Sequence, residues 1–221
     1  MSKLLNIEPV NKVRTTKEIV YLQLKESIFK NDIPHDMILT ETLLAETLNT
    51  SRTPVREAVA DLVKEGLLQL IPRKGIKVRE ISESEKEQII FLRTVIELEG
   101  YKNICEKLDE KIIADFYDLI EQQKQCVEDK NPIVFIELDQ QFHFKPIRIA
   151  ELFFLEEVLL NMYDLTRLIG HKALYKEGRM AEVIEEHTAI VKALEERNFV
   201  KIEEKLLEHL HRTQSSVLKN N

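Results

Sequence analysis

The stretch from Ser51 to Gly75 reads SRTPVREAVADLVKEGLLQLIPRKG and predicts a helix followed by a hairpin. Ser51 is suited to cap the helix, and Pro54 is tolerated in its first turn because the N–H that proline lacks would be unpaired there. Gly66 favours the end of the helix. The apolar residues in between repeat at helical spacing and predict one inner face, made of Val55, Ala58, Val59 and Leu62.

The residues on either side of this helix extend the pattern. Two short apolar runs, Leu67–Ile71 and Ile76–Ile81, flank the turn residues 72–75 and predict a β-hairpin. Upstream, one helix is predicted to start at Thr15, which has capping-box spacing to a glutamate, and a short helix follows Thr40. Three helices followed by a hairpin are the outline of a winged helix-turn-helix.

From residue 82 onward the apolar pattern is helical only. A serine and a glutamate at capping-box spacing occur twice at this point, as Ser82 with Glu85 and as Ser84 with Glu87. We therefore expect a mainly α protein with two domains: 1–81, the winged helix-turn-helix, and 82–221, an all-α antiparallel helical bundle. The six helices expected in the second domain span 84–107, 110–129, 132–149, 151–173, 179–197 and 199–217.

The composition limits the class of protein. Hydrophobic residues make up 43% and charged residues 32% of the 221 residues, which excludes a disordered chain. There is no apolar run of about 18 residues to span a membrane, and residues 1–13 lack the apolar core of a signal peptide. The two cysteines, Cys105 and Cys126, lie in helical segments without a partner motif and predict reduced thiols. We expect a cytoplasmic protein.

The charge is distributed unevenly along the chain. The net charge is -7, but residues 1–80 hold 13 Lys and Arg against 11 Asp and Glu, a net of +2. Residues 81–221 hold 19 against 28, a net of -9. This asymmetry favours a DNA-binding domain joined to a domain of another kind.

The polar face of the helix in the opening stretch carries candidate DNA contacts. Arg52, Thr53 and Arg56 lie opposite the inner face, and the two arginines are one turn apart. An arginine fork can bind guanine O6 and N7 or clamp a phosphate. Arg73 and Lys74 at the hairpin tip would reach the minor groove or the backbone. The alternative is a solvated charged face and an ordinary basic turn, but the helix-turn-helix-wing order favours DNA contact.

Three histidines and one aspartate are candidate metal ligands. His187 and His209 lie on the apolar stripes of the last two predicted helices, and His143 shares a helix face with Asp139 at i, i+4. Such donors suit Zn, Ni or Mn, with positions left for water or a ligand. The alternative is packed core histidines, with His143 hydrogen-bonded to Asp139. Because each buried polar group needs a partner, four of them in one bundle favour a metal site.

The N-terminal residues resemble the GntR family of bacterial repressors. The stretches that carry the resemblance are Leu43-Leu44-Ala45-Glu46, Ser51-Arg52-Thr53-Pro54-Val55-Arg56-Glu57-Ala58-Val59, Glu65-Gly66-Leu67 and Arg73-Lys74-Gly75. The resemblance covers residues 15–80 and implies operator contacts by Arg52, Arg56 and the wing around Gly75. This chain departs from the family at Thr42, where the second helix usually has an arginine, so one contact to a base or phosphate lacks its usual side chain.

Residues 84–213 resemble the FCD effector domain of the FadR subgroup. The matching pieces are Asp139-Gln140-Gln141-Phe142-His143, Glu186-His187-Thr188-Ala189-Ile190 and Glu208-His209-Leu210. The resemblance implies one divalent metal per chain, zinc foremost and Ni or Mn otherwise, with four ligands: Asp139, His143, His187 and His209. Six helices rather than seven resemble the shorter, VanR-like class.

The resemblance also implies a small carboxylate effector, held by the metal and a nearby arginine. Arg93, at helical spacing between Ile89 and Ile96, is the candidate effector-binding residue. The alternative for Arg93 is a surface pair with Glu97 at i, i+4.

We expect a ligand-responsive, DNA-binding transcriptional regulator that acts as a repressor. A homodimer would bind a two-fold operator with half-sites ~34 Å apart. Alternatives are a metal-responsive regulator without an organic effector and a regulator with a purely structural metal. A metal-dependent enzyme is disfavoured, because no general base or nucleophile pair is evident beyond the ligands.

Overall fold

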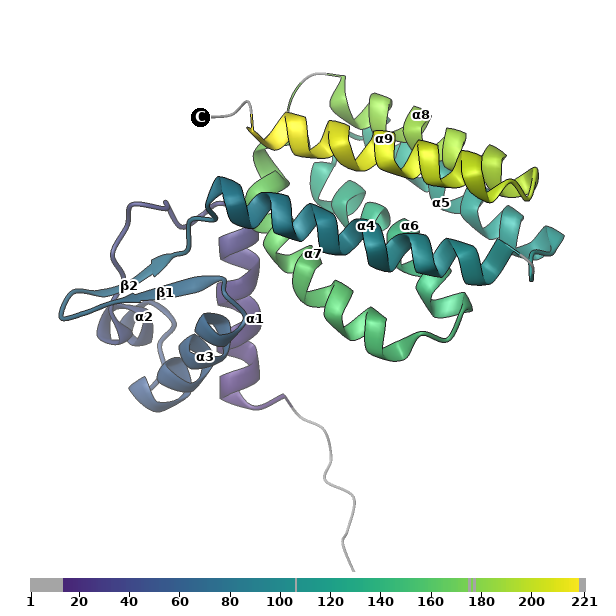
Figure 1. Cartoon of the computed structure of the whole chain (residues 1–221). Helices are drawn as coiled ribbons and strands as arrows, with labels where there is room; N and C mark the ends of the chain where they lie inside the picture. The colour runs from purple at the N-terminus through teal and green to yellow at the C-terminus, as the bar shows by residue number, and fades with distance from the viewer. Residues whose placement is uncertain (1–13, 106, 175, 177, 219–221) are drawn as a thin grey trace, which may run out of the picture. The chain divides into compact units, whose positions relative to one another are not determined.

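The computed structural model of the chain describes residues 14–105, 107–174, 176 and 178–218. The fold is mainly α, as predicted, and Figure 1 follows the helices along the chain. The chain divides into two compact units, one ending at Arg79 and one starting at Glu80. The sequence pattern predicts the domain boundary after residue 81, slightly later than the boundary after Arg79.

The first unit contains three helices and a hairpin in the predicted order. Its elements are α1 (Thr16–Phe29), α2 (Glu41–Thr47), α3 (Arg52–Lys64), β1 (Leu68–Ile71) and β2 (Gly75–Val78). A complete capping box starts α1, in which the N–H of Glu18 donates to Thr15 Oγ1 at 3.2 Å and the N–H of Thr15 donates to Glu18 Oε2 at 2.7 Å. Ser51 stands at the N-cap of α3, although its side chain makes no capping hydrogen bond. Strand β2 is shorter than the predicted run 76–81.

The hairpin is antiparallel, with Leu68 opposite Val78, and a third segment joins it. The N–H of Leu39 donates to the carbonyl of Ile76 at 2.7 Å, and the reverse bond measures 2.8 Å. This contact explains Gly75, whose φ is +144° and whose missing Cβ would lie 2.2 Å from the Leu39 carbonyl oxygen. A side chain at Gly75 would collide with the backbone that fastens the wing to the unit.

The inner face of α3 forms the centre of the first unit. The predicted residues of this face are all buried, at most 3% exposed: Val55, Ala58, Val59 and Leu62. Helix α3 packs against α1, α2 and β1. This packing leaves the opposite side of α3 to solvent.

The second unit consists, in its described residues, of the six predicted helices. They are α4 (Glu83–Cys105), α5 (Glu110–Glu128), α6 (Pro132–Ile149), α7 (Phe153–Leu174), α8 (Arg179–Glu195) and α9 (Phe199–Leu218). Of the two possible capping boxes, Ser82 with Glu85 is formed, with bonds of 3.0 and 3.3 Å. Asn131 caps α6 through the N–H of Val134, with Pro132 at the first helical position, as predicted.

Five of these helices close a ring in the order α5, α8, α9, α4 and α6, and α7 packs against α4, α6 and α9 (Figure 1). Gly100 permits a close approach of α4 to α6, because a Cβ there would lie 2.6 Å from the Ile147 side chain. The centre of the ring is filled by apolar side chains of all five helices, among them Phe116, Phe142, Ile190 and Leu206. Polar side chains that reach this interior therefore need partners within it.

Candidate functional site

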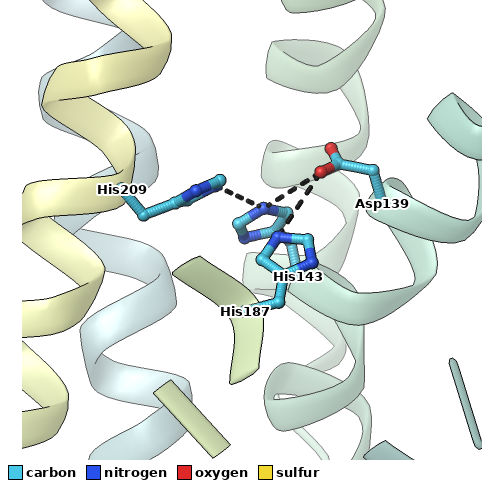
Figure 2. Close-up of side chains that lie close together, drawn as sticks. All are labelled: Asp139, His143, His187 and His209. Carbon is cyan, nitrogen blue, oxygen red and sulfur yellow. Dashed lines mark hydrogen bonds and ion pairs between the residues drawn. The ribbon is translucent and has the colours of Figure 1, made fainter. Parts of the chain in front are cut away.

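Four polar side chains meet inside the second unit (Figure 2). Asp139 and His143 come from α6, His187 from α8 and His209 from α9. One ligand atom of each residue lies within 4.8 Å of those of the other three. The structure thus brings together the four residues that the sequence singled out.

The contacts inside this cluster are short. His143 Nε2 lies 3.1 Å from His209 Nε2, and Asp139 Oδ1 lies 3.5 Å from His187 Nε2 and 3.8 Å from His143 Nε2. The three histidines are at most 2% exposed. The Asp139 side chain is 19% exposed, so it forms the solvent-facing side of the cluster.

The Nδ1 atom of each histidine is hydrogen-bonded to a buried acceptor on another residue. The Nδ1 atoms of His143, His187 and His209 lie 2.6, 2.9 and 2.6 Å from side-chain oxygens of, in order, Glu97, Gln123 and Glu186. Because these oxygens only accept, Nδ1 of each histidine is the donor, and the neutral form of each ring then presents a lone pair at Nε2.

The electrostatics of the surroundings keep the two carboxylate acceptors ionised. Burial opposes the ionisation of Glu97, but His143 and Arg93 lower its pKa to about 2. Burial likewise opposes the ionisation of Glu186, and hydrogen bonds from His209 and Arg179 lower its pKa to about 2. Burial is the main cause that holds the pKa of His187 well below its usual range, and the charges of the neighbouring histidines lower it further.

The geometry fits a bound cation. When both rings are neutral with the proton on Nδ1, their Nε2 lone pairs lie 3.1 Å apart and repel each other unless a cation lies between them. His187 Nε2 is buried and has no hydrogen-bond partner among the described residues. Three neutral imidazoles and one carboxylate are a donor set that Zn, Ni and Mn accept. The alternative prediction, an intrahelical hydrogen bond between Asp139 and His143, does not hold. Asp139 Oδ1 and His143 Nε2 lie 3.8 Å apart, which is too far for a hydrogen bond.

Arg93 faces the interior, as the first of its two interpretations predicted. It also forms the ion pair with Glu97 that the second interpretation predicted. The residue is 1% exposed, and its guanidinium donates from Nε to Glu97 Oε1 at 2.9 Å. The pair with Glu97 is therefore buried and not on the surface. Nη2 of Arg93 donates to the hydroxyl of Tyr163 at 3.1 Å.

Sequence reasoning missed the residues that surround the four. From the sequence, Glu97 is expected only as a surface partner of Arg93, and Glu186 has no predicted role. Both could have been suspected, because a buried histidine needs an acceptor for its second nitrogen. Gln123 on α5 and Tyr163 on α7 gave no signal, since their neighbours are set by helix packing.

The second group of candidate residues lies on the first unit. Arg52, Thr53 and Arg56 are exposed on the side of α3 opposite its buried face. The Arg52 guanidinium forms an ion pair of 3.2 Å with Glu41 of α2, and 67% of the Arg52 side chain remains exposed. Arg73, with a φ of +63°, and Lys74 are exposed in the hairpin turn. The structure thus leaves all five side chains accessible to a partner.

Comparison with known proteins decides the family. The model of the FCD domain matches residues 88–212, more than half of the chain, and the model of the bacterial regulatory proteins of the gntR family matches residues 16–78. The chain belongs to the GntR family and carries an FCD domain. The relatives of this GntR-family regulator are named transcriptional regulators and not enzymes, so the prediction that it is not an enzyme is confirmed.

Two curated relatives and one solved structure illustrate the family. The chain is 27% identical over 195 residues to the HTH-type transcriptional repressor RspR of Escherichia coli, covering 86% of each chain. It is 24% identical to the gluconate operon transcriptional repressor of Bacillus licheniformis, covering 81% of this chain and 75% of the relative. The fold of Escherichia coli McbR/YncC matches 94% of this chain and 99% of that one with a TM-score of 0.77 at 21% identity.

These findings make the first unit the DNA-binding part of a transcriptional regulator and the second its FCD domain. Among the described helices, none combines the length and the hydrophobicity of a membrane-spanning segment.

Proposed function

We propose that this GntR-family regulator is a repressor whose affinity for operator DNA is controlled by a small carboxylate bound at a metal site in the FCD domain. One observation carries the proposal: four ligand atoms, from Asp139, His143, His187 and His209, lie within 4.8 Å of one another. These four residues would hold one divalent metal ion per chain, zinc foremost and Ni or Mn otherwise.

The ion, when bound, supplies a Lewis acid to which a carboxylate oxygen can coordinate. The partial exposure of Asp139 supports access for a small molecule from that side of the cluster. Arg93 is the proposed effector-binding cation. Its Nε and Nη2 bind Glu97 and Tyr163, which leaves Nη1 for the effector's carboxylate.

On the DNA side, Arg52, Thr53 and Arg56 are proposed to enter the major groove at the start of α3. Arg73, Lys74 and the backbone at Gly75 are proposed to contact the phosphates or the minor groove. The exposure of the five side chains supports both roles. Because a two-fold operator is read by a two-fold protein, the active species is proposed to be a homodimer, acting in the cytoplasm where the chromosome lies.

The sense of regulation is supported by the relatives. RspR of Escherichia coli and the gluconate operon regulator of Bacillus licheniformis are both named repressors. An effector that relieves repression must bind the DNA-free state more tightly than the DNA-bound state.

The first experiment measures metal content by elemental mass spectrometry in the wild type, His187→Ala and His211→Ala. His211 is exposed on the same helix as His209 and serves as the matched control. We expect about one metal ion per chain in the wild type and in His211→Ala, and none in His187→Ala, because three ligands hold the ion less tightly than four. A wild-type protein that takes up no metal would contradict the proposed site.

The second experiment measures operator binding by fluorescence anisotropy with the metal-loaded protein and a panel of small mono-, di- and hydroxycarboxylic acids. We expect one class of acid to weaken operator binding, and the effect to disappear after chelation. If the metal alone changes operator affinity and no acid adds to the change, the protein is a metal-responsive regulator instead.

A further inference from the structure

Helices α4 and α7 supply none of the four clustered ligand atoms, yet each sends buried polar side chains toward them. Arg93 and Glu97 on α4 and Tyr163 on α7 are 1%, 0% and 2% exposed. Burying a guanidinium, a carboxylate and a phenol hydroxyl is costly unless each is hydrogen-bonded. The hydrogen-bond partners of the three side chains therefore indicate their role in the site.

The three side chains form a continuous chain of hydrogen bonds from one proposed ligand to another. His143 Nδ1 lies 2.6 Å from Glu97 Oε2, and the other oxygen of Glu97 accepts from Arg93 Nε at 2.9 Å. Arg93 Nη2 donates to the Tyr163 hydroxyl at 3.1 Å, and this hydroxyl lies 3.3 Å from Asp139 Oδ2. The chain thus begins at His143 and ends at Asp139, the two ligands on α6.

The direction of each bond is fixed by chemistry. A guanidinium can only donate, so the Tyr163 oxygen accepts from Arg93 and its proton is directed at Asp139. The guanidinium carbon of Arg93 also lies 4.4 Å from the centroid of the Tyr163 ring, which holds the phenol in place. Asp139 is thereby held by Oδ2, which leaves Oδ1 facing His187 and His143 at 3.5 and 3.8 Å.

We propose that Tyr163 and Arg93 are positioning residues of the metal site, which orient the Asp139 carboxylate from α7 and α4. This inference rests on the proposed metal site. Asp139 is the most exposed of the four ligands, so without the hydroxyl its carboxylate can rotate toward solvent. Metal affinity is then set in part by two helices that contribute no ligand, one of which, α4, begins only a few residues after the wing.

The test compares Tyr163→Phe with Tyr117→Phe. Both changes remove one hydroxyl and keep the ring, and Tyr117 bonds to Glu195, outside this network, at 2.9 Å. Zinc affinity is measured by competition with a chromophoric chelator, and the ligand field by the visible absorption of the Co²⁺-loaded protein. We expect zinc affinity to fall about 10-fold to 100-fold in Tyr163→Phe, with an altered Co²⁺ spectrum, and both to stay as in the wild type in Tyr117→Phe.

The outcomes separate this inference from the proposed function. If the wild type binds zinc and Tyr163→Phe binds it equally well with the same Co²⁺ spectrum, the positioning role is wrong and the metal site stands. A lower melting temperature of metal-free Tyr163→Phe with unchanged zinc affinity also overturns it, because the hydroxyl would then serve packing alone. If the wild type binds no zinc, the proposed function fails first.

Discussion

The two units of this regulator place the same kind of ion pair in opposite surroundings. In the winged helix, Arg52 and Glu41 lie 3.2 Å apart and the arginine side chain is 67% exposed. In the FCD domain, Arg93 and Glu97 lie 2.9 Å apart and the side chains are 2% and 0% exposed. The first pair leaves an arginine available to a large partner, whereas the second holds Nε and Nη2 of its arginine in internal hydrogen bonds, with Nη1 left for the proposed effector.

The difference shows how each unit uses polarity. A DNA-binding surface needs charges that water can still reach, because they must exchange counterions and water for phosphates and bases. A buried polar cluster needs charges that are already paired, because an unpaired one would destabilise the fold. The predictions below test this contrast, from the largest expected effect to the smallest.

The largest effect is expected from Glu97→Ala. The change leaves the buried Arg93 and His143 without their acceptor, so unfolding free energy should fall by about 3–5 kcal/mol. The measurement is urea unfolding of the metal-free protein, following the transition of the helical unit. Glu41→Ala, which unpairs the exposed Arg52, is the control and should cost less than about 1 kcal/mol. Equal losses of unfolding free energy in the two variants would show that the buried and the exposed ion pair do not differ in this way.

Metal removal should have the next largest effect. With free zinc at 100 times the dissociation constant, the ion should stabilise the FCD domain by about 2.7 kcal/mol, because it binds the folded state only. A chelator should therefore lower the melting temperature of the zinc-loaded wild type. His187→Ala should melt at the same temperature with and without chelator. A chelator effect of the same size in that variant would mean that zinc acts elsewhere.

In the winged helix, Arg56→Ala should weaken operator binding and leave stability unchanged. The loss should be about 1–3 kcal/mol if Arg56 binds a base, since a bidentate pair contributes that much to discrimination. Fluorescence anisotropy with operator DNA measures the loss, and Lys64→Ala, in the last turn of the same helix, is the control. Unaltered affinity in Arg56→Ala would remove this residue from the operator contacts.

The smallest effect is expected at the wing. Arg73→Ala should weaken binding to operator and to unrelated DNA alike and should reduce the slope of log affinity against log salt by about 1, because one phosphate contact is lost. Titrations at several salt concentrations give the slope. A loss restricted to the operator would instead assign Arg73 to base recognition.

Much of the fold could be predicted because its signals are local. The capping boxes at Thr15 and Ser82, the Asn131-Pro132 start of α6 and the hairpin turn each depend on residues a few positions apart. The inner face of α3 followed from helical spacing alone. Strand β2 and the unit boundary each differ from the prediction by a few residues. The strand ends at Val78, opposite Leu68, because the ladder extends only as far as the partner strand does, and an apolar run alone does not show this.

The four clustered residues could also be predicted, because helix geometry places Asp139 and His143 on one face and the apolar stripes carry His187 and His209 inward. The residues that surround these four could not be predicted. That Gln123 holds His187, and that Arg93 pairs with Glu97 inside the bundle and reaches Tyr163, depends on which helices pack together. Periodicity determines which face of a helix is buried, whereas only the packing of several helices decides which side chain meets another across the core.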